Sequence, residues 1–187
     1  TSFQRQKWLL LLASYLFYAA WDWRFLSLIW LSTVVDFYVG KRLEANASHR
    51  KRWLGTSVFV NLGILGLFKY FNFFADSAVQ FAQLLGLPIS EVTLQLVLPV
   101  GISFYTFQTL SYSIDIYRGS LKPCARLLDF SLFVAFFPQL VAGPIERAAT
   151  FLPQLQAQRQ WSEVDIRGAS LLFLLGFTKK AVVADNV

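Results

Sequence analysis

The sequence contains no methionine, one cysteine and one histidine among its 187 residues, and charged residues make up only 15% of it. A soluble domain carries about 25% charged residues, so the polar surface of such a domain is missing. Cys124 cannot form an internal disulfide, and one cysteine with one histidine cannot complete a zinc site of about three or four protein ligands. The same figures exclude disordered and collagen-like chains. Because methionine is absent, we expect Thr1 not to be an initiator and the chain to be a fragment of a longer protein.

Apolar residues dominate what is present. They make up 56% of the sequence, aromatic residues make up 17%, and phenylalanine alone occurs 19 times. These residues occur in long blocks rather than in the spaced stripe of a soluble amphipathic helix. The sequence therefore predicts an all-α polytopic integral membrane protein, with residues 1–187 forming a single membrane domain.

The apolar runs differ in length. Residues 53–75 and 94–117 are long enough to cross a bilayer, which takes about 20 residues. The runs at 8–20 and 25–40 are shorter and meet at a tryptophan-rich segment, which predicts two short or tilted helices joined at a membrane interface. Residues 127–142 are interrupted by Pro138, whereas residues 148–167 are polar and predict a helix on the membrane surface. Interrupted runs predict re-entrant or tilted helices around an internal cavity, because lipid tolerates irregular backbone only where protein or water covers it.

Basic residues predict the orientation of these helices. Residues 41–52 and 118–126 are rich in lysine and arginine, whereas residues 76–93 contain neither. By the positive-inside rule the first two segments are cytoplasmic and the third is extracytoplasmic. Asp36 is close to the first basic loop, and we expect it to pair there. We expect His49, inside that loop, to be solvated rather than catalytic.

The stretch LPVGISFYTFQTLSYSIDIYRG, residues 98–119, carries the first group of candidate residues. Pro99 and Gly101 interrupt the helix near its start. Beyond them, helical spacing places several polar side chains along one side: Ser103, Tyr105, Gln108, Ser111, Tyr112 and Asp115. Polar groups at membrane depth usually face a bundle interior or a wet cavity. They form either a wall of a substrate tunnel or hydrogen bonds that hold helices together.

The cytoplasmic end of this stretch is basic. Asp115 and Arg118 are three residues apart on a helix, the spacing of an ion pair. Arg118, with Lys122 and Arg126, predicts a cytosolic mouth that attracts the phosphates of a donor such as a coenzyme A thioester. The alternative is that these residues only set the topology.

The second group lies in FFPQLVAGPIER, residues 136–147. Pro138 and the Gly-Pro pair at 143–144 predict irregular backbone, whose free amides and carbonyls can bind a substrate. Gln139, Glu146 and Arg147 flank the break. A simple turn between two short helices fits as well, and transporters show the same pattern.

Three blocks in this order, LPVGISFYTFQTLSYSIDIYRG, DFSLFVAFFPQLVAGPIER and GFTKKAVVADNV, resemble the membrane-bound O-acyltransferase family, in particular its bacterial alginate O-acetyltransferase branch. GLFKYFNFFADS and LLASYLFYAAWDWRF are similar to earlier blocks of that branch. The resemblance extends over nearly the whole chain.

The resemblance implies a multi-helix bundle around a tunnel. Within it, an acyl group, in this branch acetyl, passes from a cytosolic thioester such as acetyl-CoA toward hydroxyl groups of an exported polysaccharide such as alginate. It also implies an inner-membrane location, extracytoplasmic acyl-accepting partner proteins, and no bound cofactor, metal or nucleic acid. The signature histidine of the family lies downstream of the last block, so we expect no catalytic residue in this chain and no activity from it alone. Some relatives carry a histidine where this chain has Gln139.

Acyl transfer requires a base, oxyanion donors and a site shielded from water. This chain would supply the walls and donor contacts of that site through seven residues: Tyr105, Gln108, Ser111, Asp115, Arg118, Gln139 and Arg147. The competing functions are a multi-pass transporter or flippase, for which we find no internal repeat, and a non-catalytic assembly subunit.

Overall fold

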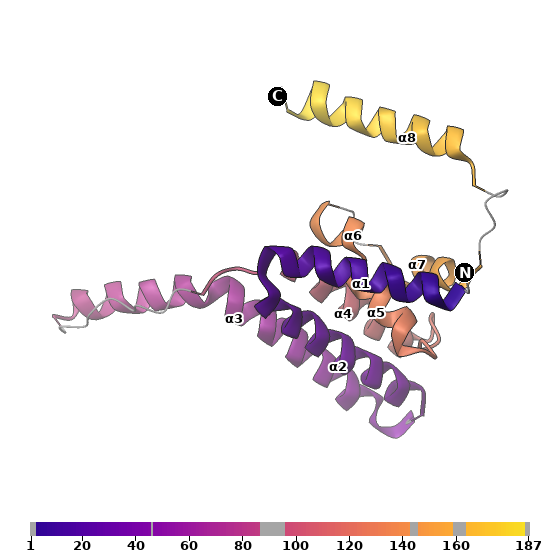
Figure 1. Ribbon diagram of the computed structural model, residues 1–187. Helices are drawn as coiled ribbons and strands as arrows, with labels where there is room; N and C mark the ends of the chain where they lie inside the picture. The colour runs from indigo at the N-terminus through magenta and orange to yellow at the C-terminus, as the bar shows by residue number, and fades with distance from the viewer. Residues whose placement is uncertain (1–2, 46, 87–95, 143–145, 159–163, 186–187) are drawn as a thin grey trace. The chain divides into compact units, whose positions relative to one another are not determined.

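The protein is described from a computed structural model that covers residues 3–45, 47–86, 96–142, 146–158 and 164–185. Every regular element in these ranges is helical, as the all-α prediction requires. In chain order (Figure 1) they are α1 (Phe3–Asp22), η1 (Trp23–Phe25), α2 (Leu26–Ala45), η2 (Ala47–His49), α3 (Arg50–Leu84), α4 (Ile102–Arg118), α5 (Leu127–Ala135), α6 (Phe137–Ala142), α7 (Ala148–Gln156), α8 (Ile166–Thr178) and η4 (Lys179–Ala184).

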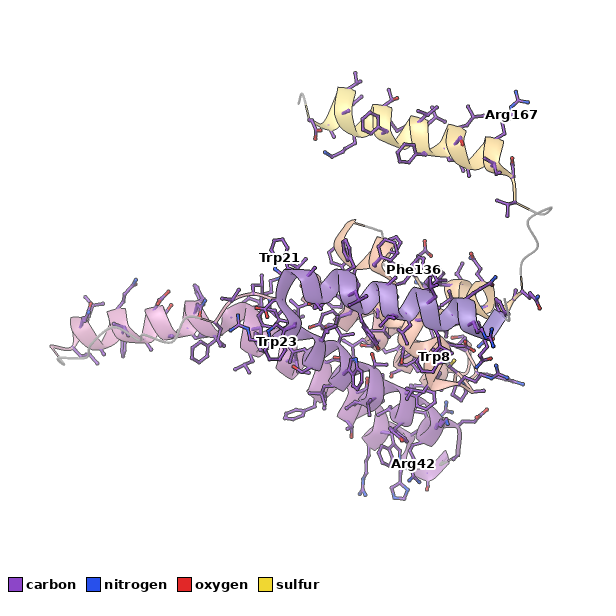
Figure 2. All side chains as sticks on the ribbon, in the orientation of Figure 1. Trp8, Trp21, Trp23, Arg42, Phe136 and Arg167 are labelled. Atoms are coloured by element: carbon purple, nitrogen blue, oxygen red, sulfur yellow. The ribbon has the colours of Figure 1, made fainter. Side chains whose placement is uncertain are left out.

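The first two helices form the predicted hairpin, but each is longer than its apolar run. Both α1 and α2 contain 20 residues, about 30 Å at 1.5 Å per residue. The turn between them is capped by Asp22, whose carboxylate accepts a hydrogen bond from the backbone N–H of Arg24 at 3.0 Å. Figure 2 shows Trp21 and Trp23 at this turn, where both are more than 70% exposed.

Helix α3 is the element that is long and apolar enough to cross a membrane, judged by length and composition within the described ranges. It contains 35 residues, and only 11% of its most apolar window is buried inside the protein. The helix continues well beyond the predicted run at 53–75. The proposed extracytoplasmic segment 76–93 therefore starts as helix, and residues 87–93 lie outside the described part.

The predicted breaks at Gly101 and Pro138 are present, whereas the Gly-Pro pair at 143–144 lies outside the described residues. Helix α4 begins at Ile102, directly after Gly101, whose φ of 74° lies in the left-handed region that only glycine enters at little cost. A Cβ on Gly101 would also lie 2.6 Å from the carbonyl oxygen of Leu140. Pro138 cannot donate a backbone hydrogen bond, so α5 ends at Ala135 and α6 starts afresh at Phe137.

The contacts divide the chain into two units, residues 1–156 and 157–187. In the first unit, α2, α3 and α4 pack on one another, and α5 packs on α1, α2 and α7. Its core includes the fully buried Phe130, Phe133, Tyr105 and Tyr112. The second unit holds α8 and η4, which contact each other. The predicted surface helix at 148–167 is shorter than expected, since α7 ends at Gln156.

Candidate functional site

Tyr105 lies at a junction of three helices near the start of α4. Gly101 lets α4 approach α6 at Leu140, and Tyr18 of α1 donates a hydrogen bond from its hydroxyl to the carbonyl oxygen of Val100 at 2.8 Å. Tyr105 is 0% exposed, and its hydroxyl has no hydrogen-bond partner among the described residues. Leaving a buried donor unpaired costs about 1–3 kcal/mol, so this hydroxyl is a candidate for binding substrate.

Gln108 and Ser111 make hydrogen bonds within the helix bundle. The Gln108 Nε2 donates to the carbonyl oxygen of Phe133 on α5 at 2.8 Å, and both groups are buried. The Ser111 hydroxyl donates to the carbonyl oxygen of Gln108, also at 2.8 Å. On the same helix, the Tyr112 hydroxyl accepts a hydrogen bond from the backbone N–H of Cys124 at 2.9 Å. These contacts favour the helix-joining interpretation for Gln108 and Tyr112, whereas Tyr105 stays available for the tunnel interpretation.

Asp115 and Arg118 do not pair with each other in the described part of the chain. Asp115 instead contributes through its backbone. Its carbonyl oxygen accepts hydrogen bonds from Ser120 and Leu121, which close the last turn of α4. Arg118 is exposed. The spacing was right for an ion pair, but an exposed pair gains little in water and does not hold its two side chains together.

A hollow of about 340 Å³ lies between α6 and α7. Gln139, Glu146, Thr150 and Gln154 supply its polar wall, and the other lining residues are Phe136, Pro138 and Phe151. The predicted break at Pro138 therefore opens a concave site, and Glu146 belongs to it. Arg147 is exposed and does not line this hollow; its carbonyl oxygen instead starts α7 by accepting from Thr150 and Phe151 at 3.0 and 3.1 Å.

A second hollow, of about 250 Å³, lies at the carboxyl end of α4. It is lined by two cations, Lys122 and Arg50, and by one carboxylate, Glu44. Arg50 donates to the carbonyl oxygens of Ile116 and Tyr117 at 2.8 and 2.7 Å. Of the three residues predicted to form a cytosolic mouth, only Lys122 lines this hollow. Arg126 donates to the side chain of Gln4 on α1 at 3.1 Å. The site that could receive phosphates therefore includes Arg50, which the sequence pattern did not single out.

Asp36 corrects a prediction. It is 0% exposed, and none of the ion pairs among the described residues joins it to the basic loop. Its carboxylate accepts hydrogen bonds from the hydroxyls of Ser57 and Ser113 and, at 2.6 Å, from the amide of Asn61. The Thr109 hydroxyl donates to the side-chain oxygen of Asn61 at 3.0 Å. These five residues, the Asp36 cluster, join α2, α3 and α4.

The position of Asp36 follows from helix length and direction. Helix α2 runs to Ala45, which places Asp36 more than two turns inside the helix. The face of α2 that carries Asp36 is turned toward α3 and α4. One pattern in the sequence could have indicated this cluster: Ser57 and Asn61 are four residues apart on α3, and Thr109 and Ser113 are four residues apart on α4. Side chains four residues apart share a helix face.

A pair of buried charged groups joins α1 and α5. The Lys7 ammonium on α1 lies 2.6 Å from the carboxylate of Asp129 at the first turn of α5, and both residues are buried. Lys69 and His49 are exposed, and the His49 ring contacts the Ser48 hydroxyl at 2.9 Å. The described residues contain no group of three metal-ligating side chains.

Comparison with known proteins adds relatives but no structural template. A probable alginate O-acetylase of Azotobacter vinelandii is 40% identical over 182 residues, and one of Pseudomonas syringae is 41% identical over the same length. Both alignments cover 96% of this chain. A peptidoglycan O-acetyltransferase of Helicobacter pylori is 32% identical over 206 aligned positions, which cover 95% of the chain. No family model and no solved structure matches.

The shared region is a minor part of each relative. The alignments cover 36% of the Azotobacter protein, 35% of the Pseudomonas protein and 38% of the Helicobacter protein, so the chain spans about a third of their length. Along nearly its own whole length, however, the chain is homologous to alginate and peptidoglycan O-acetylases, and its predicted relationship to the alginate O-acetyltransferase branch of the membrane-bound O-acyltransferase family is confirmed.

Proposed function

We propose that this chain forms part of a membrane-bound O-acyltransferase that moves an acetyl group from a cytosolic thioester, such as acetyl-CoA, toward hydroxyl groups of a cell-envelope or extracellular polysaccharide such as alginate. The observation that carries the proposal is the 40% identity to an alginate O-acetylase over 96% of the chain. The protein is an inner-membrane, multi-pass protein in this proposal. Residues 41–52 and 118–126 face the cytoplasm, and residues 76–93 face the other side, where partner proteins receive the acyl group.

The two hollows suit the two ends of such a reaction. Arg50 and Lys122 outnumber the single carboxylate, Glu44, in the hollow at the carboxyl end of α4, where the phosphates of a coenzyme A thioester would bind. Gln139 and Glu146, beside the aromatic rings of Phe136 and Phe151, form a wall suited to groups that both donate and accept hydrogen bonds. These placements support binding of donor and acceptor at separate positions.

Tyr105 is the candidate oxyanion donor. Its buried, unpartnered hydroxyl can donate to the charge that develops on the thioester carbonyl, and a donor held in place in a dry site stabilises that charge without reorganising. The base that deprotonates the acceptor hydroxyl is expected outside this chain. Gln108, Ser111, Asp115 and Arg118 then position α4 and its carboxyl end rather than touching the reacting atoms.

The test of the function is transfer of labelled acetyl from acetyl-CoA by the intact protein in proteoliposomes, with polysaccharide and envelope partners on the other side. We expect label on polysaccharide hydroxyls and no turnover by residues 1–187 alone. Transport of the acceptor without formation of an ester would favour the carrier function. Assembly of partners with neither activity would favour the scaffolding function.

Two variants of α4 test the role of Tyr105. Tyr105→Phe should lower kcat about 10²- to 10³-fold, the usual effect of removing one oxyanion donor, without lowering stability, since no hydrogen bond within the described residues is lost. Tyr112→Phe is the matched control. It removes the hydroxyl that accepts from Cys124 and should lower the unfolding temperature with a smaller effect on kcat. Equal kinetic effects of the two substitutions would remove Tyr105 from the site.

A further inference from the structure

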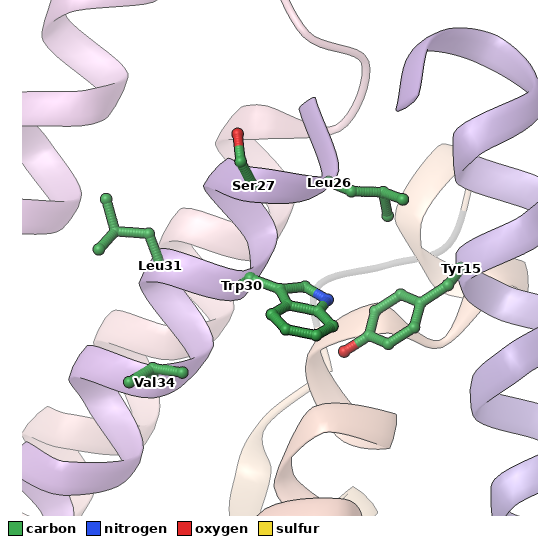
Figure 3. A pocket seen from close by; sticks show the side chains of 6 residues that line it. All are labelled: Tyr15, Leu26, Ser27, Trp30, Leu31 and Val34. Atoms are coloured by element: carbon green, nitrogen blue, oxygen red, sulfur yellow. The ribbon is translucent and has the colours of Figure 1, made fainter. Parts of the chain in front are cut away.

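An apolar groove runs along the diverging helices of the α1–α2 hairpin. It consists of two adjoining hollows, of about 570 and about 330 Å³, that share Tyr15, Trp30 and Val34. Figure 3 shows the Tyr15 and Trp30 rings facing each other across the gap between the helices; their centroids are 6.0 Å apart. Leu127 and Leu128 of α5 line the second hollow. The volumes lie in the range of ligand sites, about 300–1,000 Å³.

The lining of the groove is suited to a hydrocarbon chain. Both hollows are lined mainly by aliphatic and aromatic side chains. Trp30 remains 57% exposed and Trp8, at the far end, 58% exposed. Large apolar side chains exposed together on a protein mark a surface that lipid or a partner covers.

One end of the groove is positively charged on all three of its helices. Arg5 is three residues before Trp8 on the same face of α1, and Arg126 directly precedes Leu127 at the start of α5. On α2, Lys41 is seven residues, two turns, after Val34, and its ammonium lies 4.3 Å from the centroid of the Phe37 ring. All three cations are exposed.

These three cations outnumber the one unpaired acid near this end, Glu44, which is three residues after Lys41 on α2 and is in none of the ion pairs of the described residues. Asp129 is already paired with the buried Lys7. None of the ion pairs formed by the described residues involves Arg5, Lys41 or Arg126. The Arg126 side chain contacts only the neutral Gln4 in the hydrogen bonds of this part of the chain.

We propose that this groove binds an anionic phospholipid, with one acyl chain lying between α1 and α2 and the phosphate headgroup held by Arg5, Lys41 and Arg126. The orientation agrees with the charge pattern, because these cations are at the end that the positive-inside rule assigns to the cytoplasm, where they meet anionic headgroups of that leaflet. The proposal rests on the membrane location in the proposed function and not on acyl transfer. It adds a lipid site separate from the hollows that contain Arg50 and Gln139.

The experiment measures lipid retention by the intact protein purified in detergent. Carbonate-resistant sedimentation with membranes is established first, so that loss of the membrane assignment is recognised separately. Synthetic phosphatidylglycerol or phosphatidylcholine with identical acyl chains is then added, and bound lipid is counted by native mass spectrometry at low and high salt. We expect one phosphatidylglycerol retained in preference to phosphatidylcholine, with the preference weakening at high salt.

Two variants with matched controls separate the headgroup from the chain. Arg126→Gln should reduce phosphatidylglycerol retention about fivefold, the effect of one basic residue near an anionic surface, and leave phosphatidylcholine unchanged. Val34→Trp should fill the groove and reduce retention of both lipids. Lys51→Gln, an exposed cation of the basic loop, and Leu16→Trp, an exposed apolar position outside the groove lining, should behave as the unmodified protein.

Three results would overturn the proposal. Equal retention of the two lipids by the unmodified protein removes the headgroup site. Undiminished retention by Val34→Trp removes the groove as the place of the chain. No retained lipid, combined with a lower unfolding temperature for Val34→Trp, shows that another part of the protein covers the groove.

Discussion

Removing the Asp36 carboxylate is the most informative perturbation of the helix bundle, because one side chain accepts hydrogen bonds from two other helices. In Asp36→Ala the hydroxyls of Ser57 and Ser113 and one N–H of Asn61 lose their acceptor in a fully buried setting. Each orphaned neutral donor costs about 1–3 kcal/mol, but a serine hydroxyl can rotate to the carbonyl of the preceding turn. The lower bound applies to each donor, and the free energy of unfolding should fall by about 3 kcal/mol.

The isosteric substitution sharpens this prediction. In Asp36→Asn the side-chain oxygen can still accept from both serines, but its NH₂ group faces the NH₂ group of Asn61, so one hydrogen bond becomes a contact between two donors. We expect a loss of about 1–2 kcal/mol, smaller than for alanine. Reversible unfolding of the purified protein in mixed micelles, followed by circular dichroism, measures both values. Asp76→Ala, an exposed carboxylate on α3, is the control and should change stability by less than about 0.5 kcal/mol.

An Asp36→Ala variant as stable as Asp76→Ala would show that the Asp36 carboxylate does not hold the three helices together. A greater loss of stability for asparagine than for alanine would show that the cluster is not held by hydrogen bonds to the carboxylate. A gain in stability for both substitutions would mean that desolvating the carboxylate costs more than its three donors return.

Three further predictions follow from single contacts. Lys7→Met or Asp129→Leu should each lower the free energy of unfolding by about 3–5 kcal/mol, since each leaves a buried charge unpaired, whereas the double substitution should recover part of the loss; additive losses in a double-mutant cycle would contradict a direct pair. A non-glycine residue in the left-handed conformation costs about 1–2 kcal/mol. Gly101→Ala should lower the free energy of unfolding by more than this, because the added Cβ would also contact the Leu140 carbonyl oxygen. A loss below about 1 kcal/mol in the same unfolding assay would show that the turn can relax. Burial raises the pKa of the Cys124 thiol, so its alkylation by iodoacetamide should be slow at pH 8 and should rise with pH only above the range of an ordinary thiol; labelling as fast as in the unfolded chain would refute this.

Local breaks and overall class could be predicted from the sequence because they depend on short-range chemistry. Gly101 and Pro138 fix where helices begin and end through a left-handed φ and a missing N–H, and the structure places α4 and α6 accordingly. The apolar excess predicted membrane helices; every regular element in the described ranges is helical, and α3 is long and apolar enough to cross a membrane. The order of similar blocks along the chain determined the relationship to alginate O-acetylases.

Side-chain contacts between residues far apart in the sequence became apparent only in the tertiary structure. Asp36 was predicted to pair with the basic loop, yet packing turns it toward α3 and α4. Packing also brings Lys7 to Asp129, 122 residues away. Arg50 likewise reaches the end of α4, 66 residues further along. Helical spacing determines which side chains share a face, but which face meets which helix depends on the packing of the whole bundle, and local spacing alone does not reveal that pairing.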